Sequence, residues 1–329
     1  MAIPGTSTGQ RSTGRPVVFT AGSCGNFMVW TGTTAAANPN TNWVNFANVA
    51  SGYSFPQAPV TSFSSNHGPA FVLMPSGVQA YVAWTDAATS QVMYTTATLA
   101  NGAWSLQSPA TAIPNSNAAS GPEAVVGLQD NQLVLGLLWM DNGAKALVGC
   151  QVLIGSSTPN LNFASLGVAC VDRPDMVQAG GQTFLAFFDA SNNFNLVIDP
   201  NGGVAFNMTT RQTFSGINSS YGPSFVPLSG KTQAYLFWTS GTGGTATLQY
   251  QQMGLAQNGT WAFNSTAGCQ GSVTGATPSA APYGQLIETV DGNGVTQMQF
   301  LVAWPDTNGS PINLVYTDTV TPNYAPIPI

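Results

Sequence analysis

Short apolar runs separated by turn residues fill the chain, and the stretch from Ser65 to Trp104 shows the plan most clearly. Apolar runs occupy residues 70–74, 79–84 and 91–95, and a further run begins at Trp104. The segments between them carry Pro-Ser-Gly, an Asp-led turn and Asn-Gly, which are typical of hairpin connections between β-strands. Long stretches with apolar residues at 3.6-residue spacing are missing. We therefore expect an all-β chain built from units of four antiparallel strands.

This plan recurs at a nearly fixed period along the whole chain. A proline follows the turn at the start of each unit, and the intervals between these prolines are 53, 53, 52, 49 and 55 residues: Pro16, Pro69, Pro122, Pro174, Pro223 and Pro278. An aromatic residue keeps step with them: Trp30, Trp84, Trp139, Phe188, Trp238 and Trp304. Repeats of this length with several short strands are typical of propeller blades. The pattern predicts a six-bladed β-propeller with about 52 residues and four antiparallel strands per blade, each blade starting near one of these prolines.

The repeat leaves two parts of the chain outside the regular units. Residues 16–329 are expected to form a single ring of blades, and residues 1–15 an N-terminal arm. The last unit carries an Asp-, Gly- and Asn-rich insertion at 287–294, and its final segment, 323–329, contains two prolines that suit an edge strand. We hypothesise that the N-terminal arm pairs at this edge and covers it.

The amino-acid composition argues against two classes of binding partner. Only 5% of the 329 residues are charged, and the net charge is −6, which argues against nucleic acid and against anionic membrane surfaces. The sequence contains no run of about 18 apolar residues, so it predicts no helix that spans a membrane. The first residues lack a charged segment followed by an apolar core, so we expect a protein that is cytosolic, or secreted without a signal peptide of this kind, and acts on extracellular glycans.

Four cysteines are too few and too scattered for a disulfide framework: Cys24, Cys150, Cys170 and Cys269. Cys150 and Cys170 fall in one unit, so a disulfide between them is one alternative and buried free thiols are the other. No cysteine or histidine cluster predicts zinc. Asp291-Gly-Asn293-Gly and Asp306-Thr-Asn308-Gly resemble pieces of calcium loops but lack the downstream glutamate. We expect no cofactor, with calcium as the alternative left open.

Most polar candidates for a site converge on one end of the predicted ring. Because strands alternate in direction, the connection between units and the turn between the second and third strands of a unit open at the same end. The first kind of connection supplies Asn66, His67, Arg173 and Tyr221, with Glu123 and Asp175 just beyond; the second supplies Asp86, Asp141, Asp189 and Asp306. An aspartate after a strand also shapes the turn itself, so a structural role competes with ligand binding for these four.

The tryptophans divide into two groups. Those inside apolar runs are expected to pack between blades. Trp104, Trp261 and Trp43 follow turn residues, and a flat indole face can stack on the C–H face of a sugar ring. For these three, stacking on a sugar and plain packing remain equal alternatives.

Catalytic motifs are absent from the sequence. The chain has one histidine and no Gly-x-Ser-x-Gly segment. Glycoside hydrolysis needs two facing carboxylates, and nothing in the spacing pairs Glu123, Asp175 and Asp189. The complete Ser-x-Asp-x-Gly-x-x-Trp repeat of sialidases is also missing. We therefore expect a protein that is not an enzyme, with no catalytic residues.

A strand-ending tryptophan with a tyrosine on the next strand occurs three times, as Trp84/Tyr94, Trp238/Tyr250 and Trp304/Tyr316. In this layout the chain from Pro16 onward resembles the lectin-type β-propellers of fungi and bacteria. The six-bladed fucose-binding lectins place an arginine, a glutamate and an aromatic residue in each site. This chain departs from that pattern, because it has four arginines and only Glu123 and Glu288, so fucose specificity does not carry over.

The resemblance implies a lectin that binds glycans or glycoproteins as a monomer or small homo-oligomer and acts in recognition, agglutination or defence. Several weak sites would lie on the propeller face or between blades, and linkage of weak sites can raise avidity by about 10²–10⁴. A propeller scaffold for protein–protein interaction is the alternative from another class, and a glycoside hydrolase is the third.

Overall fold

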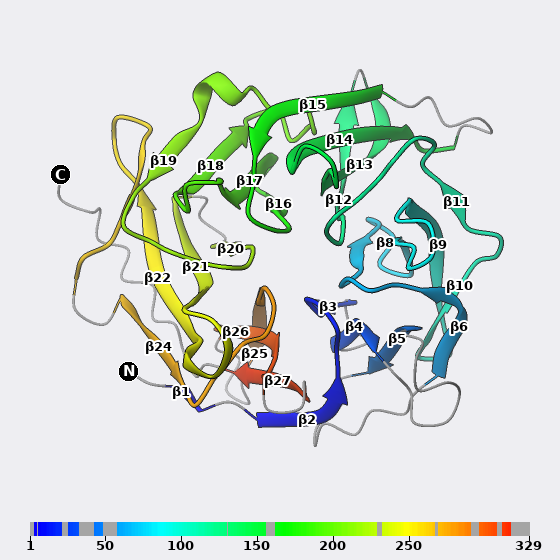
Figure 1. The fold of residues 1–329 in the computed structure, drawn as a ribbon, viewed down its shortest axis with the longest axis horizontal. Helices are drawn as coiled ribbons and strands as arrows, with labels where there is room; N and C mark the ends of the chain where they lie inside the picture. The colour runs from blue at the N-terminus through cyan, green and yellow to red at the C-terminus, as the bar shows by residue number, and fades with distance from the viewer. Residues whose placement is uncertain are drawn as a thin grey trace.

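The computed structural model describes residues 3–4, 6–21, 26–32, 43–48, 58–129, 131–155, 162–228, 232–266, 269–290, 296–307 and 311–316. Its strands form six sheets that lie around a common axis (Figure 1). Pairing within these sheets is antiparallel apart from a two-residue parallel contact of β1 (Ile3–Pro4) with β24. The expectation of an all-β chain with four-stranded antiparallel units is confirmed.

The first three sheets follow one another along the chain. The first contains β3 (Val17–Thr20), β4 (Asn26–Gly32), β5 (Trp43–Asn48) and β6 (Ala58–Ser64). The second contains β7 (Ala70–Leu73), β8 (Gln79–Thr85), β9 (Val92–Ala100) and β10 (Ala103–Leu106), with β11 (Thr111–Ala112) also paired to β9. The third contains β12 (Glu123–Gln129), β13 (Gln132–Met140), β14 (Ala146–Leu153) and β15 (Asn162–Ala169).

The other three sheets complete the arrangement. The fourth contains β16 (Asp175–Ala179), β17 (Gln182–Phe188), β18 (Phe194–Asp199) and β19 (Gln212–Phe214), with the 3₁₀ turn η2 (Met208–Thr210) before β19. The fifth contains β20 (Ser224–Pro227), β21 (Gln233–Ser240), β22 (Thr247–Leu255), β23 (Trp261–Phe263) and β24 (Gln270–Thr274), with η3 (Gly243–Thr245) between β21 and β22. The sixth contains β25 (Tyr283–Val290), β26 (Thr296–Pro305) and β27 (Pro311–Tyr316).

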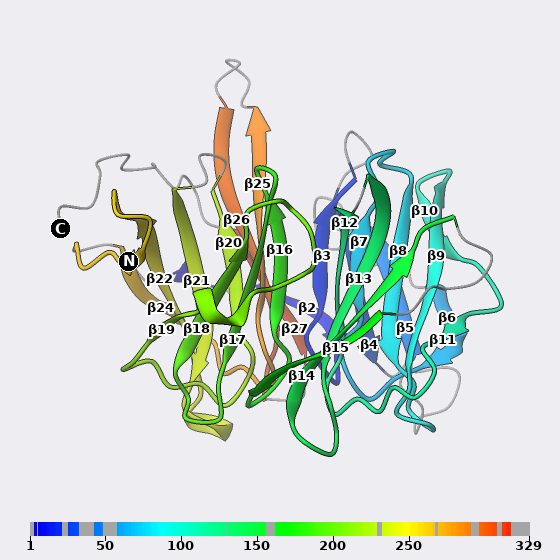
Figure 2. The same cartoon turned by 90° about the horizontal axis from the view of Figure 1, so that it is seen from above.

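The sixth sheet takes its fourth strand from the other end of the sequence. β2 (Thr6–Arg11) pairs antiparallel with β27, and Thr6 lies opposite Leu314. We had expected residues 323–329 to form this outer strand and the N-terminal arm to cover its edge. The arm instead pairs directly with β27, and residues 323–329 lie outside the described part. The β25–β26 hairpin extends beyond its neighbours at one end of the molecule (Figure 2).

One unit boundary differs from the prediction. The proline directly before the innermost strand of the sixth sheet is Pro282, since β25 begins at Tyr283. Pro278 instead forms an isolated bridge with Asp306 in the connection that leads to this strand. The anchor of the last unit is therefore Pro282, because the equivalent prolines Pro69 and Pro122 also stand immediately before their inner strands.

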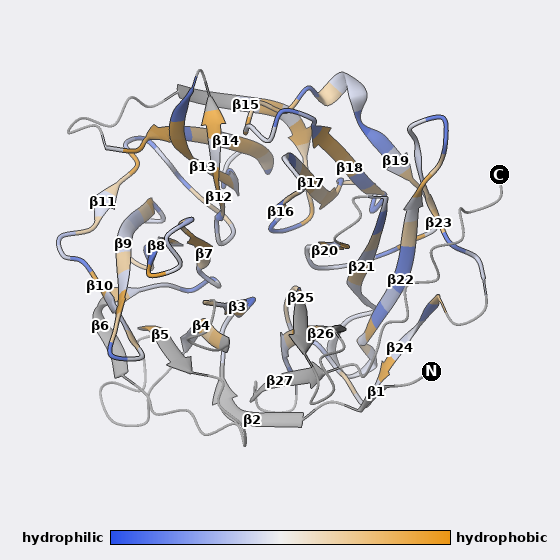
Figure 3. Ribbon diagram, turned by 180° about the vertical axis from the view of Figure 1, so that it is seen from behind, coloured by the Kyte–Doolittle hydropathy of each residue, from blue (hydrophilic) through white to orange (hydrophobic). Residues whose placement is uncertain are grey.

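Apolar residues concentrate along the strands, and hydrophilic residues concentrate in the connections (Figure 3). The side chains pack between neighbouring sheets, as expected for Trp30, Trp84, Trp139 and Trp304, which are 1–2% exposed. The rings of Phe19 and Phe71, from the first and second sheets, stack with centroids 3.7 Å apart. No helix within the described ranges is long and apolar enough to cross a membrane.

Candidate functional site

The connections between sheets and the turns between second and third strands meet at one end of the molecule. Four isolated bridges show this, because each joins a residue just before an inner strand to an aspartate just after a second strand: Ser65 to Asp86, Ala118 to Asp141, Cys170 to Asp189 and Pro278 to Asp306. The convergence expected from alternating strand directions is therefore present in the backbone.

A pocket of about 330 Å³ lies where the connections meet. We call it the central pocket. Segments that precede the innermost strands of all six sheets line it, together with Met140: Thr13–Arg15, His67–Gly68, Ala119, Gly121, Val171–Arg173, Ser220–Tyr221 and Ser279–Ala281. Of the residues expected to bind a ligand, His67, Arg173 and Tyr221 are brought together here, whereas Asn66 is exposed and does not line the pocket.

A buried group of four charged side chains lies at the base of these connections. We call Arg15, Glu123, Arg173 and Asp175 the central ion-pair cluster. Nη2 of Arg15 lies 2.5 Å from Oδ1 of Asp175, and Nη1 of Arg15 lies 3.1 Å from Oε1 of Glu123. Nε of Arg173 also donates to Glu123. Since two guanidinium groups face two carboxylates, the cluster carries no net charge.

Further contacts connect this cluster to the remaining sheets. Arg173 donates from Nη1 to the carbonyl oxygen of Gly68 and from Nη2 to that of Pro69, both at 2.9 Å. Oδ2 of Asp175 accepts the N–H of Phe225 at 2.5 Å. The guanidinium carbon of Arg15 lies 4.7 Å from the ring centroid of Tyr283. The inner strands of all six sheets, or the residues just before them, therefore take part in one network.

Burial dominates the electrostatics of the cluster. Burial raises the pKa of Glu123, and the guanidinium groups of Arg15 and Arg173 oppose that rise. Burial alone would lower the pKa of Arg15, but the carboxylates of Asp175 and Glu123 outweigh it and raise this pKa. Glu123, Arg173 and Asp175 are only 3–5% exposed and are occupied by one another. These three residues therefore hold the sheets together, and of the three only Arg173 also lines the central pocket.

The walls of the central pocket combine polar and apolar groups. The N–H of Gly222 donates to Oδ2 of Asp172 at 3.1 Å, and burial raises the pKa of Asp172. Burial lowers the pKa of His67, and the carboxylate of Asp172 opposes that shift. Burial, followed by the charge of Asp172, raises the pKa of Tyr221. The charge of Asp172 therefore acts on both His67 and Tyr221, which line the same pocket.

Three of the four strand-following aspartates are occupied by their own turns. Oδ1 of Asp86 accepts the N–H of Thr89 at 2.9 Å, Oδ1 of Asp141 that of Gly143 at 2.9 Å, and Oδ1 of Asp189 that of Ser191 at 2.9 Å. These three shape the hairpins, which is the structural alternative weighed from the sequence. Asp306 instead accepts from the hydroxyl of Thr277, in the connection that leads to β25. None of the four lines the central pocket.

Two of the three candidate stacking tryptophans lie in the core. Trp104 is 8% exposed and meets Phe71 edge-on at 5.2 Å, and Trp261 is 4% exposed and meets Phe225 edge-on at 5.7 Å. Their indoles fill the space between sheets, in place of the sugar-stacking role we had considered. The backbone of Trp43 begins β5, and its side chain lies outside the described part.

The cysteines within the described ranges are free thiols. There, Cys150 and Cys170 are free and buried, which removes the disulfide alternative, and Cys269 is free and half-buried. No group of three histidine, cysteine, aspartate or glutamate side chains lies together in the ranges that the structure covers. The segments around Asp291 and Asn308, where we had weighed calcium, lie outside them.

Sequence analysis missed two members of the network, Arg15 and Tyr283. Arg15 precedes Pro16 just as Arg173 precedes Pro174, so the repeat already indicated that the two arginines occupy equivalent positions in their units. Tyr283 follows Pro282 and was hidden by the misplaced unit boundary. Placing the last unit at Pro282 would have revealed Tyr283.

No protein-family model and no sequence among the curated proteins matches this chain. Solved structures are similar in fold. Trypanosoma rangeli sialidase in complex with sialic acid aligns with 98% of this chain and 55% of its own, at 11% identity and a TM-score of 0.54. A mutant of AofleA from Arthrobotrys oligospora aligns with 76% of this chain and 67% of its own, at 14% identity and a TM-score of 0.50.

The SapL1 lectin in complex with alpha methyl fucoside aligns with 97% of this chain and 100% of its own, at 12% identity and a TM-score of 0.48. This chain spans little more than half the length of the sialidase chain. At identities of 11–14%, the likeness to the sialidase and to AofleA concerns the fold alone.

Proposed function

We propose that this protein is a six-bladed propeller that binds a glycan in the central pocket and does not hydrolyse it. The observation that supports this most directly is that connections of all six sheets form one pocket of about 330 Å³, lined by both polar and apolar groups. That volume is at the lower end of the range for small-molecule sites, which suits one or two sugar rings.

The lining chemistry supports a neutral sugar. The half-buried ring of Tyr221 offers an aromatic face and a hydroxyl, and His67 and Ser220 add hydrogen-bonding groups. The two arginines that line the pocket already face Glu123 and Asp175, so their charges are neutralised. Fold similarity to a sialidase bound to sialic acid is consistent with a carbohydrate-related role.

Binding without hydrolysis is supported by the carboxylates. Asp172 is the single acidic residue among those that line the pocket. Glu123 and Asp175, the nearest other acids, are buried in ion pairs. The usual glycosidase mechanism needs an acid and a second carboxylate on either side of the bond.

A glycan array, probed with and without a chelator, is the first test. Tyr221→Ala should abolish binding, and Tyr221→Phe should retain it if the ring face carries the contact. Asp86→Asn is the matched control, because Asp86 lies at the same end of the molecule but serves its own turn. Calorimetry should give one site per chain. An array without signal from folded protein, or loss of binding only in Asp86→Asn, would contradict the proposal.

A protein-binding scaffold is the second candidate, favoured by a different observation. The exposed large apolar side chains of the described residues are Val78, Leu128, Leu133 and Leu255. All four lie in or beside turns at the end opposite the central pocket; for example, the N–H of Leu255 donates to the carbonyl of Thr232 between neighbouring turns. A pull-down whose signal depends on Leu128 and Leu133 but not on Tyr221 would favour this candidate.

A further inference from the structure

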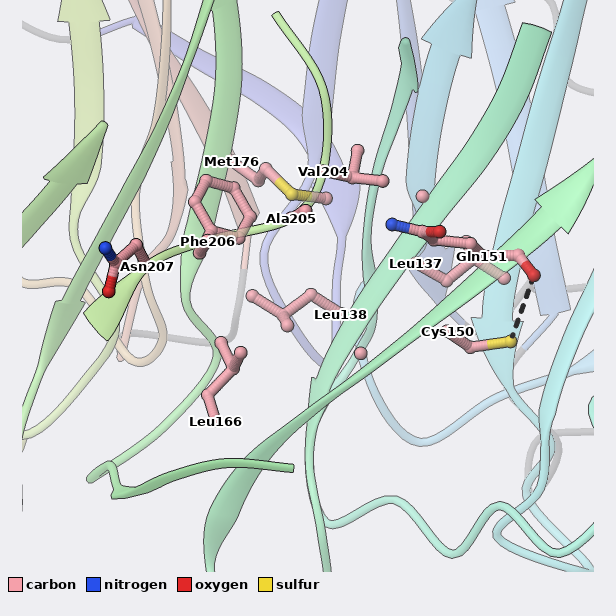
Figure 4. A pocket seen from close by; sticks show the side chains of 12 residues that line it. Leu137, Leu138, Cys150, Gln151, Leu166, Met176, Val204, Ala205, Phe206 and Asn207 are labelled. Carbon is pink, nitrogen blue, oxygen red and sulfur yellow. Dashed lines mark hydrogen bonds between the residues drawn. The ribbon is translucent and has the colours of Figure 1, made fainter. Parts of the chain in front are cut away.

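A second cavity, of about 390 Å³, lies between the third and fourth sheets, away from the connections that form the central pocket. We call it the intersheet cavity. One wall is the surface of β13 and β14, and the other is Met176 with the segment Val204–Asn207 (Figure 4). This segment belongs to the 12-residue connection between β18 and β19, which crosses onto the neighbouring sheet.

The cavity lies over Gly149, on the face of the third sheet that this residue shares with Gly136. Gly136 pairs with Gln151 and Leu138 pairs with Gly149, so these four residues point to the same face. A methyl group on Gly136 would lie 2.3 Å from Cγ1 of Val204, so Val204 fills the space above this glycine. No side chain rises from Gly149, and the sheet surface beside Leu138 stays hollow.

The walls are apolar and carry no charge. Leu138 and Met176 are 3% and 5% exposed, and the half-buried side chains of Leu166 and Phe206 complete the enclosure. Figure 4 shows Leu138, Met176, Phe206 and Leu166 gathered around the same space. None of the residues that line the cavity is ionisable apart from the thiol of Cys150, and burial raises the pKa of that thiol to about 12. A charged ligand would find no counter-charge here.

Two amides supply the polar groups. Oδ1 of Asn207 accepts the N–H of Thr209 at 3.1 Å, which leaves its amide nitrogen with no partner among the described residues. The side-chain amide of Gln151 likewise has no hydrogen bond to any residue that the structure describes. Asn207 and Ala205 are exposed and mark the opening, while Gln151 is half-buried. A ligand with an apolar body and one hydrogen-bonding group would pack against the apolar walls and bond to one of these amides.

We propose that the intersheet cavity binds a small, neutral, largely apolar molecule with a single hydrogen-bonding group, such as a medium-chain alcohol or an arylamine. An apolar cavity of about 150 Å³ is enough to take up benzene, so a volume of about 390 Å³ admits a molecule of two or three rings or an alkyl chain. This ligand is chemically distinct from a glycan, and the site shares no residue with the central pocket.

The probe is N-phenyl-1-naphthylamine, which is neutral and fluoresces when it leaves water. We expect saturable binding to the intact chain, displacement by 1-octanol and no displacement by octanoate. Gly149→Val would fill the hollow above this glycine, and Leu166→Trp would narrow the edge of the cavity. Each variant should weaken probe binding about tenfold or more, which corresponds to a loss of about 1.4 kcal/mol in binding free energy. Leu255→Trp adds an indole elsewhere and should bind as the parent does.

Three results would overturn the proposal: absence of saturable binding, equal displacement by octanoate, or unchanged binding in both cavity variants after their folding has been verified by circular dichroism. If Gly149→Val fails to fold, Leu166→Trp still tests the proposal, because Leu166 is only half-buried and its replacement should disturb the fold less. Tyr221→Ala should leave probe binding intact, so that this test and the test of glycan binding can fail independently.

Discussion

The guanidinium of Arg15 and the carboxylate of Asp175 lie 2.5 Å apart, although 160 positions separate them in the chain. This pair connects the residue before the first inner strand to the first residue of β16. Both side chains are buried, and both share the network with Glu123 and Arg173. Removal of one partner leaves an uncompensated charge in the interior, which is the costly case for a buried ion pair.

Asp175→Asn should therefore lower the free energy of unfolding by about 3–5 kcal/mol, as measured by urea denaturation. The amide no longer neutralises Arg15, and it accepts the N–H of Phe225 less strongly. Arg211→Met, at an exposed position, is the control and should change stability by less than about 0.5 kcal/mol. Equal stability of the two variants would show that the cluster does not hold the sheets together.

Gly68→Ala should destabilise the fold through a backbone clash. A Cβ at this position would lie 2.0 Å from the carbonyl oxygen of Arg15, and backbone on both sides leaves little room to move. We expect a loss of about 1–3 kcal/mol in thermal or urea unfolding. Gly244→Ala serves as the matched change, since no atom lies within 4 Å of its added methyl, and its stability should match the parent.

His67 is the only histidine, so its ring protons give one assignable NMR titration. Burial lowers its pKa from 6.5, and we expect a midpoint below that value. The unfolded chain then takes up a proton at a pH where the folded chain does not, so His67 makes stability fall as pH drops from about 6.5 to the folded pKa. His67→Gln should remove this component. A midpoint above 6.5 would mean that Asp172 outweighs burial.

Cys150 and Cys170 should resist alkylation in the folded protein. Burial raises the pKa of each thiol to about 12, and the two residues are 2% and 4% exposed. Very little thiolate is present at pH 8, and the reagent has no access to it. Iodoacetamide followed by peptide mass mapping should find both unmodified until urea is added. Rapid native modification of either residue would contradict the packing described here.

Deletion of residues 1–11 should lower the melting temperature while Arg15 and its ion pairs remain. The deletion removes β2 and exposes the edge of β27, with an expected loss of about 2 kcal/mol. An unchanged melting temperature would show that the pairing of Thr6 with Leu314 contributes no stability.

The sequence by itself determined the all-β class, the turns and the period. Alternation and turn residues are local, so the strands over 70–74 and 79–84 and the Asx turns at Asp86, Asp141 and Asp189 follow from near neighbours in the chain. Burial of Trp30, Trp84, Trp139 and Trp304 was predictable for the same reason, since each stands inside an apolar run.

Only the tertiary structure decided what the charged residues do. Glu123, Arg173 and Asp175 looked like candidate ligands because spacing placed them at one end, but spacing does not reveal which charges neutralise one another. Their partner Arg15 comes from a distant part of the chain, 160 positions from Asp175. The intersheet cavity was equally hidden, because Gly136 and Gly149 reach one face through strand register, and Val204 packs over Gly136 from a connection of the fourth sheet. Contacts of this kind depend on how distant segments pack, which no local pattern encodes.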